Sequence, residues 1–241
     1  MSATPRRRLL VAFVVPPLLV VAACGSGADP DTGRASGGGD LALEAIVEAT
    51  VRVRADGCGP RTELGTGTAI GDGLVITAAH VVAGADDVSV VDRAGTSIAA
   101  EVVAFDPDLD VAALRPATDV DGSVPLRDAV GRQGEGGVVA LISADGTVDA
   151  VAVDVLQRVA IRTTDIYRDQ PVERSGLRVD VDVEPGDSGA MVHLPGGGVG
   201  IIWSRSTTTD DQAWTVDLPG ELLDASTRRS LVDSVDVGRC R

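Results

Sequence analysis

The amino-acid sequence predicts an all-β protein with one helix near its C-terminus, and three observations support this prediction. From Leu41 onward, apolar residues fall mainly into β-branched runs of roughly four to ten residues, which suits strands. Gly, Asp and Pro separate these runs, as turns require. A helical pattern with start signals occurs only in residues 219–236. About 200 residues can form one large core or two small ones.

The predicted strands follow one another along the chain without an internal repeat. Two turns carry specific chemistry, because Asp92 to Gly95 and Asp145–Gly146 place glycine where a positive φ is needed, so each predicts a β-hairpin. Residues 117–136 are rich in turn residues and predict a break between two halves. The predicted strands lie in residues 49–57, 65–79, 88–106, 111–116, 137–146, 148–162, 177–183, 191–204 and 213–217.

The start of the chain predicts an export signal at residues 1–23. Three arginines at positions 6–8 precede an apolar run that is short and interrupted by proline, and Val-Ala-Ala-Cys ends it at Cys24. This ending resembles the bacterial lipobox, which implies a lipidated Cys24 anchored at the outer face of the plasma membrane. The alternative is an ordinary secretory signal in which Cys24 has no role. Residues 24–40 then predict a flexible tether, and residues 41–241 the folded domain.

The charge of the chain is strongly acidic. All 21 basic residues are arginine, and the formal net charge is −15. Removal of the signal, with its three arginines, leaves a net charge of about −18. Nucleic acid and anionic lipid surfaces are therefore poor partners. The acidity either attracts basic substrates or only keeps the protein soluble.

The remaining cysteines, Cys58 and Cys240, predict a disulfide, because an exported chain matures in an oxidising compartment. A bond between them would close a loop of about 180 residues, which contributes about 4 to 5 kcal/mol in the chain-entropy model.

Candidate chemistry begins with the two histidines, His80 and His193. A lone histidine is more often structural, but His80 is followed by Asp110 and by Ser188 in a Pro-Gly-Asp-Ser-Gly sequence. Acyl transfer by a serine needs a base, an acid that orients the base, and N–H donors for the oxyanion. The order His, Asp, Ser differs from the Ser, Asp, His order of α/β-hydrolases.

Three motifs in this order, at residues 65–84, 105–116 and 183–192, resemble a trypsin-like serine protease. Their spacing is similar to that of the bacterial HtrA-type and the mycobacterial periplasmic acid-resistance proteases, and the similarity covers roughly residues 50–225. The resemblance implies a chymotrypsin-like double six-stranded β-barrel. Its N-terminal barrel would span about 45–125, its C-terminal barrel about 135–220 and its terminal helix about 219–236.

The resemblance also implies residue roles and a peptide or protein substrate. His80 would act as general base and acid, Asp110 would orient it, and Ser188 would be the nucleophile. The N–H groups of Gly186 and Ser188 would form the oxyanion hole, where glycine suits a conformation that a Cβ opposes. Neither a cofactor nor a metal is implied, and the chain leaves no room for a PDZ module after the protease domain.

Two aspartates compete with Asp110, namely Asp106 and Asp108, and Asp110 is preferred because it directly precedes the apolar run Val-Ala-Ala-Leu. In trypsin-like proteases that are activated by cleavage, the aspartate at the position of Asp187 pairs with the newly formed N-terminus. The Ile-Val at residues 46–47 could supply such an N-terminus, but no basic cleavage residue precedes it. We therefore expect Asp187 to accept hydrogen bonds within the domain.

Substrate selection is predicted from three residues. Asp182, six residues before Ser188, holds the position that would floor a pocket for basic side chains in trypsin-like enzymes. The alternative is that Asp182 belongs to the solvated face of the alternating strand 178–184. Trp203 and Ser204 would lie on the strand that pairs with extended substrate, although Trp203 could equally be a core residue.

Two other functions stay open beside the endopeptidase. Ala190 and Met191 depart from the usual sequence after the serine, which leaves room for a pseudoprotease that binds peptide without cutting it. A third possibility is an enzyme that is active only when Cys58 and Cys240 are oxidised.

Overall fold

The computed structural model describes residues 37–128 and 130–241. The predicted export signal, Cys24 and most of the predicted tether lie outside these residues. Within the described ranges, none of the helices has both the length and the apolar character needed to cross a membrane.

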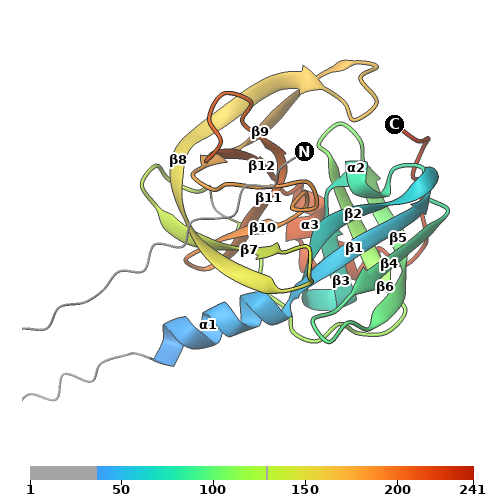
Figure 1. Cartoon of the computed structure of the whole chain (residues 1–241), viewed down its shortest axis with the longest axis horizontal. Helices are drawn as coiled ribbons and strands as arrows, with labels where there is room; N and C mark the ends of the chain where they lie inside the picture. The colour runs from blue at the N-terminus through green and yellow to red at the C-terminus, as the bar shows by residue number, and fades with distance from the viewer. Residues whose placement is uncertain (1–36, 129) are drawn as a thin grey trace, which may run out of the picture. The chain divides into compact units, whose positions relative to one another are not determined.

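The described chain forms two closed six-stranded barrels, one from each half of the sequence (Figure 1). This arrangement confirms the predicted all-β double barrel. The N-terminal barrel has the strand order β1-β2-β3-β6-β5-β4, and the C-terminal barrel has the order β10-β11-β12-β9-β8-β7. The strands are β1 Thr50–Gly57, β2 Gly59–Ile70, β3 Leu74–Thr77, β4 Asp87–Val91, β5 Ser97–Asp106, β6 Val111–Pro116, β7 Gly136–Ile142, β8 Val148–Thr164, β9 Pro171–Val179, β10 Met191–Leu194, β11 Gly197–Arg205 and β12 Ala213–Asp217.

Both predicted hairpins are present, and glycine closes each turn. Gly95, with φ of 84°, donates its N–H to the Asp92 carbonyl at 3.0 Å between β4 and β5. Gly146, with φ of 90°, donates to the Ser143 carbonyl at 2.9 Å between β7 and β8. A side chain with a Cβ would be strained at either φ.

The helices differ from the prediction of a single terminal helix. The end of the chain contains two short helices, α3 Gly220–Leu223 and α4 Ala225–Ser230. Asp224 separates them, because its extended backbone ends α3 while its carboxylate accepts the Thr227 N–H and caps α4. Three further helices were not expected from the sequence, namely α1 Gly37–Glu48, η1 Gly71–Gly73 and α2 Ala79–Val82.

The interior of the barrels consists of small and branched apolar side chains, since only 2% of the residues are aromatic. Val53, Ile76 and Leu114 are fully buried in the N-terminal barrel. The same cluster of contacts includes Ile201 from β11, so the cores of the two barrels are continuous. Each such side chain contributes about 1.5 to 3 kcal/mol when it leaves water. This packing supports the rigid frame that positions the candidate site.

The C-terminal segment returns to the N-terminal barrel and ends there. Val235 donates its N–H to the Val102 carbonyl at 2.9 Å, and Gly84 donates to the Val237 carbonyl at 3.0 Å. A disulfide joins Cys58 to Cys240, with 5.5 Å between their Cα atoms. The segment therefore holds the loop that directly follows α2.

Candidate active site

His80 lies in α2, which is separated from the end of β3 by one residue, Ala78. The strand is fully buried between β2 and β6, and the Val81 and Val82 side chains of α2 pack into the core. The His80 side chain is the exception, with 11% of its surface exposed. The strand-to-helix junction thus presents an imidazole from a rigid base.

Asp110 ends a tight loop between β5 and β6. Its φ of 66° is in the left-handed region, which aspartate tolerates better than most residues. The Asp106 carboxylate accepts the N–H groups of Asp108 and Leu109 at 2.9 and 2.8 Å, and the Asp110 N–H donates to the Asp106 carbonyl at 2.9 Å. Asp106 therefore organises the loop, and this fixes the direction of the Asp110 side chain.

The structure brings Asp110, of the three candidate aspartates, to His80. The imidazole Nδ1 lies 2.8 Å from Oδ2 and 3.0 Å from Oδ1 of Asp110, and the His80 backbone N–H donates to Oδ1 at 2.8 Å. Asp108 is exposed and accepts a hydrogen bond from Gln170 instead. A carboxylate at Nδ1 favours the tautomer whose proton is on Nδ1, and this leaves Nε2 free to accept a proton.

Ser188 lies in the serine loop, which we define as residues 184–189. The loop begins with a turn in which the Asp187 N–H donates to the Glu184 carbonyl at 3.0 Å. Pro185 occupies the second position, and Gly186 occupies the third with φ of 108°. This pattern is a type II turn, whose central peptide is flipped relative to that of a type I turn. The turn therefore fixes the orientation of the Gly186 N–H.

Asp187 is buried and accepts the Glu184 N–H at 2.7 Å, as expected of a carboxylate that is used within the domain. Glu184 and Asp187 are therefore joined by two hydrogen bonds, one from the Glu184 N–H to the Asp187 carboxylate and one from the Asp187 N–H to the Glu184 carbonyl. The serine loop is thereby closed on itself directly before the serine.

The serine loop docks on the N-terminal barrel through Thr66 of β2. The Thr66 N–H donates to the Ser188 carbonyl at 2.8 Å, and the Thr66 hydroxyl donates to the Gly186 carbonyl at 2.9 Å. The Thr77 hydroxyl, at the end of β3, donates to the Thr66 carbonyl at 2.8 Å. These bonds place the loop beside the junction that carries His80.

Two glycines allow this close approach. A Cβ at Gly65 would lie 2.6 Å from the Val81 side chain and 3.1 Å from the Ser188 carbonyl oxygen. A Cβ at Gly189 would lie 2.1 Å from the Thr66 carbonyl oxygen. Gly65 therefore lies between the serine loop and α2, the helix that contains both His80 and Val81.

Sequence reasoning missed Arg174, whose guanidinium is buried beside Asp110. Its Nη1 lies 3.8 Å from Asp110 Oδ2, and both side chains are almost inaccessible. The only signal in the sequence is a charged residue at an inward-facing position of strand 171–179, where it reads as one more surface arginine.

The three predicted specificity residues, Asp182, Trp203 and Ser204, have different surroundings. Asp182 is exposed between the buried side chains of Val181 and Val183, so the predicted alternation in burial is present, but the predicted strand is not, because β9 ends at Val179. Trp203 lies at an irregularity in the pairing of β11 with β12, and its ring contacts the Arg174 guanidinium. The neighbouring Ser204 hydroxyl donates to the Arg205 carbonyl at 3.3 Å.

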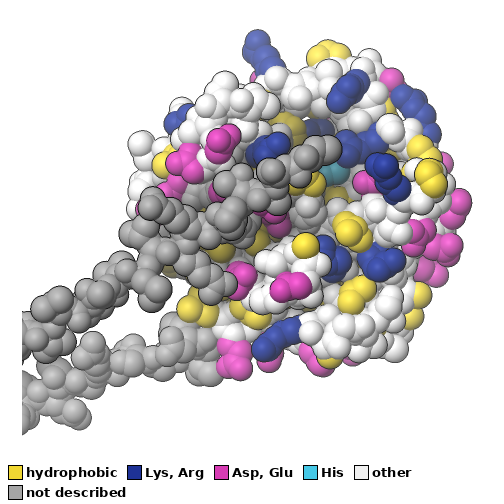
Figure 2. All heavy atoms as spheres, in the orientation of Figure 1, with side chains coloured by type: hydrophobic (Ala, Val, Ile, Leu, Met, Phe, Trp, Pro, Cys, Tyr) yellow, Lys and Arg dark blue, Asp and Glu magenta, His cyan; other side chains and the backbone are white. Residues whose placement is uncertain are grey.

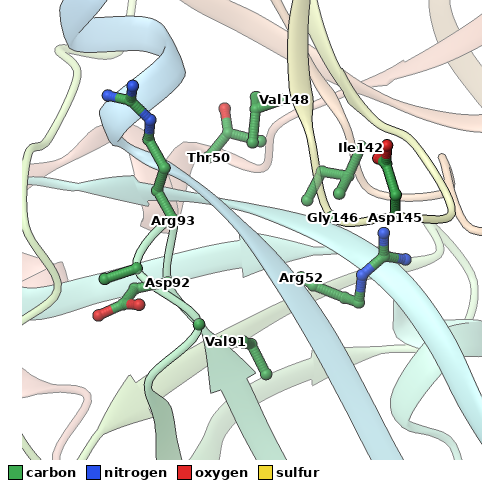
Figure 3. A pocket seen from close by; sticks show the side chains of 11 residues that line it. Thr50, Arg52, Val91, Asp92, Arg93, Ile142, Asp145, Gly146 and Val148 are labelled. Atoms are coloured by element: carbon green, nitrogen blue, oxygen red, sulfur yellow. The ribbon is translucent and has the colours of Figure 1, made fainter.

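A pocket of about 210 Å³ lies between the β4–β5 hairpin, the β7–β8 hairpin and β1. Figure 3 shows Arg93 and Asp92 on one side of this pocket and Arg52 and Asp145 on the other. Arg52 donates to the Ser143 carbonyl at 2.7 Å, and its Nη1 would lie 3.9 Å from a Cβ at Gly186. The pocket is therefore a neighbour of the serine loop, although His80, Asp110 and Ser188 do not line it.

Histidine reaches the surface in a recess of the face drawn in Figure 2, near the place where Figure 1 labels α2. Arginine side chains surround this recess in the same view. An imidazole that is accessible and held by a buried carboxylate can take a proton from a group in the recess.

The double barrel, the contact of His80 with Asp110 and the docking of the serine loop on β2 are the features that point to the class of the protein. Residues 65–199 match the model of the trypsin-like peptidase domain, and the chain belongs to that family. The resemblance expected from the three motifs is thereby confirmed.

The relatives include the serine protease Rv3671c of Mycobacterium tuberculosis, which is 34% identical over 181 residues. That match covers 73% of this chain and 44% of the relative. A probable periplasmic DegP-like serine endoprotease of Halomonas elongata is 34% identical over 151 residues, with 61% and 31% covered. The chain thus spans less than half the length of these two relatives.

The crystal structure of the Rv3671c protease in its active form resembles this structure with a TM-score of 0.75 and 26% identity. The alignment covers 97% of this chain and 99% of that one. The likeness therefore extends over the whole double barrel.

Proposed function

We propose that this chain is a serine endopeptidase in which Ser188 is the nucleophile, His80 the general base and Asp110 the residue that orients His80. The contact that supports the proposal most directly is the 2.8 Å distance between His80 Nδ1 and Asp110 Oδ2. The buried carboxylate stabilises the imidazolium that forms when His80 takes a proton.

In the proposed reaction, His80 Nε2 removes the hydroxyl proton while Ser188 Oγ attacks the peptide carbonyl. The tetrahedral oxyanion accepts hydrogen bonds from the N–H groups of Gly186 and Ser188, and the type II turn at Glu184 to Asp187 supports this role for Gly186. His80 then gives its proton to the leaving amine. Water repeats the sequence on the acyl-enzyme and releases the acid.

Fluorophosphonate labelling of the full chain tests the nucleophile, because the probe reacts only with an activated serine. We expect labelling of the wild type and none of Ser188→Ala or His80→Ala. A folded wild type that resists the probe from about pH 5 to about pH 8 would favour the pseudoprotease, which should still bind an extended peptide.

A second proposal is that Asp182 selects substrates with basic side chains, and a kinetic comparison of two substrates tests it. Its place six residues before Ser188 supports the role, whereas its exposure supports the solvated face. If Asp182 selects by charge, Asp182→Ala lowers kcat/KM for an arginine substrate by at least about tenfold and leaves a leucine substrate unchanged. Equal changes for both substrates would assign Asp182 to the surface.

We also propose that the chain is exported and lipid-anchored through Cys24. The arginines, the short apolar run and the Val-Ala-Ala-Cys ending support this proposal. Radiolabelled palmitate should enter the wild type in a bacterial host, and Cys24→Ser should abolish both the label and membrane association. A Cys24→Ser chain that stays with the membrane would contradict the lipid anchor.

A further inference from the structure

Arg174 lies on β9 and points into the molecule rather than into solvent. Its side chain is 3% exposed, whereas the flanking Glu173 and Ser175 are exposed. Its Nε donates to the Asp108 carbonyl at 2.7 Å, and Nη2 donates to the Thr164 carbonyl at 3.4 Å. Two backbone carbonyls, one in the loop between β5 and β6 and one at the end of β8, therefore hold the guanidinium in one orientation.

The plane of the guanidinium is also held. Its central carbon lies 4.5 Å from the centroid of the Trp203 ring, within the range of a cation–π contact. A lysine would supply the charge but neither the planar stacking nor the divergent donors. With these contacts made, Nη1 remains directed to Asp110 Oδ2 at 3.8 Å.

The charges around this guanidinium are carboxylates from two loops. Burial lowers the pKa of Arg174, and nearby carboxylates oppose that effect, with Asp110 the strongest of them. The others are Asp106 and Asp108 before β6 and Asp165 after β8. These carboxylates make burial of the Arg174 guanidinium possible, because burial of an unpaired cation would cost a large amount of free energy.

We propose that Arg174 is a positioning residue for the serine peptidase reaction, acting through Asp110. This inference rests on the proposed function. The guanidinium lies behind the carboxylate and holds it toward the backbone N–H and the Nδ1 of His80, and it places a positive charge 3.8 Å from Asp110 Oδ2. Removal of the cation should therefore weaken the alignment and let the pair take up a proton at a higher pH.

The experiment compares Arg174→Gln and Arg174→Lys with the wild-type full chain. Arg178→Gln is the matched control, because Arg178 lies on the same strand and contacts the Trp214 ring instead. One readout is the acid limb of the pH profile for fluorophosphonate labelling. The other is NMR titration of the imidazole protons, which is simple because the chain has two histidines and His80→Ala assigns them.

We expect Arg174→Gln to move the acid limb and the His80 titration midpoint upward by about one pH unit, and to slow labelling about tenfold. Arg174→Lys should keep both midpoints within about 0.3 units of the wild type, and Arg178→Gln should change neither. Slower labelling with unmoved or lower midpoints in folded Arg174→Gln would overturn the proposal.

If Arg174→Gln fails to fold, the double variant Asp110→Asn/Arg174→Gln replaces it, since it removes the charges of both members of the buried Arg174 and Asp110 pair. Its His80 midpoint should lie above that of Asp110→Asn alone, and an equal or lower midpoint would overturn the proposal. The NMR titration needs no catalysis. An unlabelled wild type would therefore contradict the proposed function, while the titration would still decide the effect of Arg174 on His80.

Discussion

Thr66 holds Ser188 from the opposite barrel. The Thr66 N–H on β2 donates to the Ser188 carbonyl at 2.8 Å, so the serine loop of the C-terminal half is built on a strand of the N-terminal half. The hydroxyl of the same threonine reaches the Gly186 carbonyl, 120 residues away in sequence. A single residue thus contacts both residues whose N–H groups are the proposed oxyanion donors, one through its backbone and one through its hydroxyl.

Replacement of Thr66 by valine should impair the chemistry more than the fold. Thr66→Val keeps the backbone bond to Ser188 but leaves the Gly186 carbonyl without its hydroxyl partner. We expect the free energy of unfolding to fall by about 1 kcal/mol and kcat to fall about tenfold. Thr62→Val, four residues earlier on β2 where the hydroxyl contacts Asp56, is the control and should leave kcat unchanged. A Thr66→Val enzyme with wild-type kcat would contradict this role.

A Cβ at Gly186 should disable the type II turn. The space around Gly186 is open, with Arg52 Nη1 3.9 Å away, so the effect of Gly186→Ala would come from its φ of 108°. We expect kcat to fall about 100-fold, as for loss of one oxyanion donor, while unfolding changes by about 1 kcal/mol. Gly71→Ala adds a methyl group in open space without a positive φ and serves as the control. Equal kinetics for the two variants would mean that the turn does not matter.

The disulfide should stabilise the fold without switching the chemistry. Cys58→Ser/Cys240→Ser opens a loop of 182 residues and should cost about 4 kcal/mol of unfolding free energy, measured by denaturant titration. We expect labelling of Ser188 to persist below the lowered melting temperature, because the bonds between His80 and Asp110 do not involve the C-terminal segment. Lost labelling in a folded double variant would instead support an enzyme that requires oxidation.

His193 should reduce stability in acid. Burial lowers its pKa to about 4, from about 6.5 in the unfolded chain. The unfolded state therefore binds the proton more readily, so stability is intact above about pH 6.5 and falls as the pH drops toward 4, by about 3 kcal/mol. His193→Leu removes this component, and its unfolding free energy should depend less on pH over that interval. Parallel pH curves for the two proteins would exclude the effect.

The strands and hairpins could be predicted because their determinants are local. In β1, alternation along Val51, Arg52, Val53 and Arg54 sets which side chains face inward, and Gly95 and Gly146 close turns that other residues resist. The helices were predicted less well. α1 begins in a glycine-rich stretch that reads as a tether, and the terminal helical pattern hides the break at Asp224. Local patterns do not report the packing that stabilises such short helices.

The sequence by itself determined the class of fold, the family and the order of His80, Asp110 and Ser188. Only the tertiary structure decided which aspartate meets His80, that Thr66 supports the serine loop, and that Arg174 lies behind Asp110. The reason is physical: these contacts join residues as far as 120 positions apart, and they depend on how two closed barrels dock. An inward arginine on a strand looks like a surface arginine until the fold shows what surrounds it.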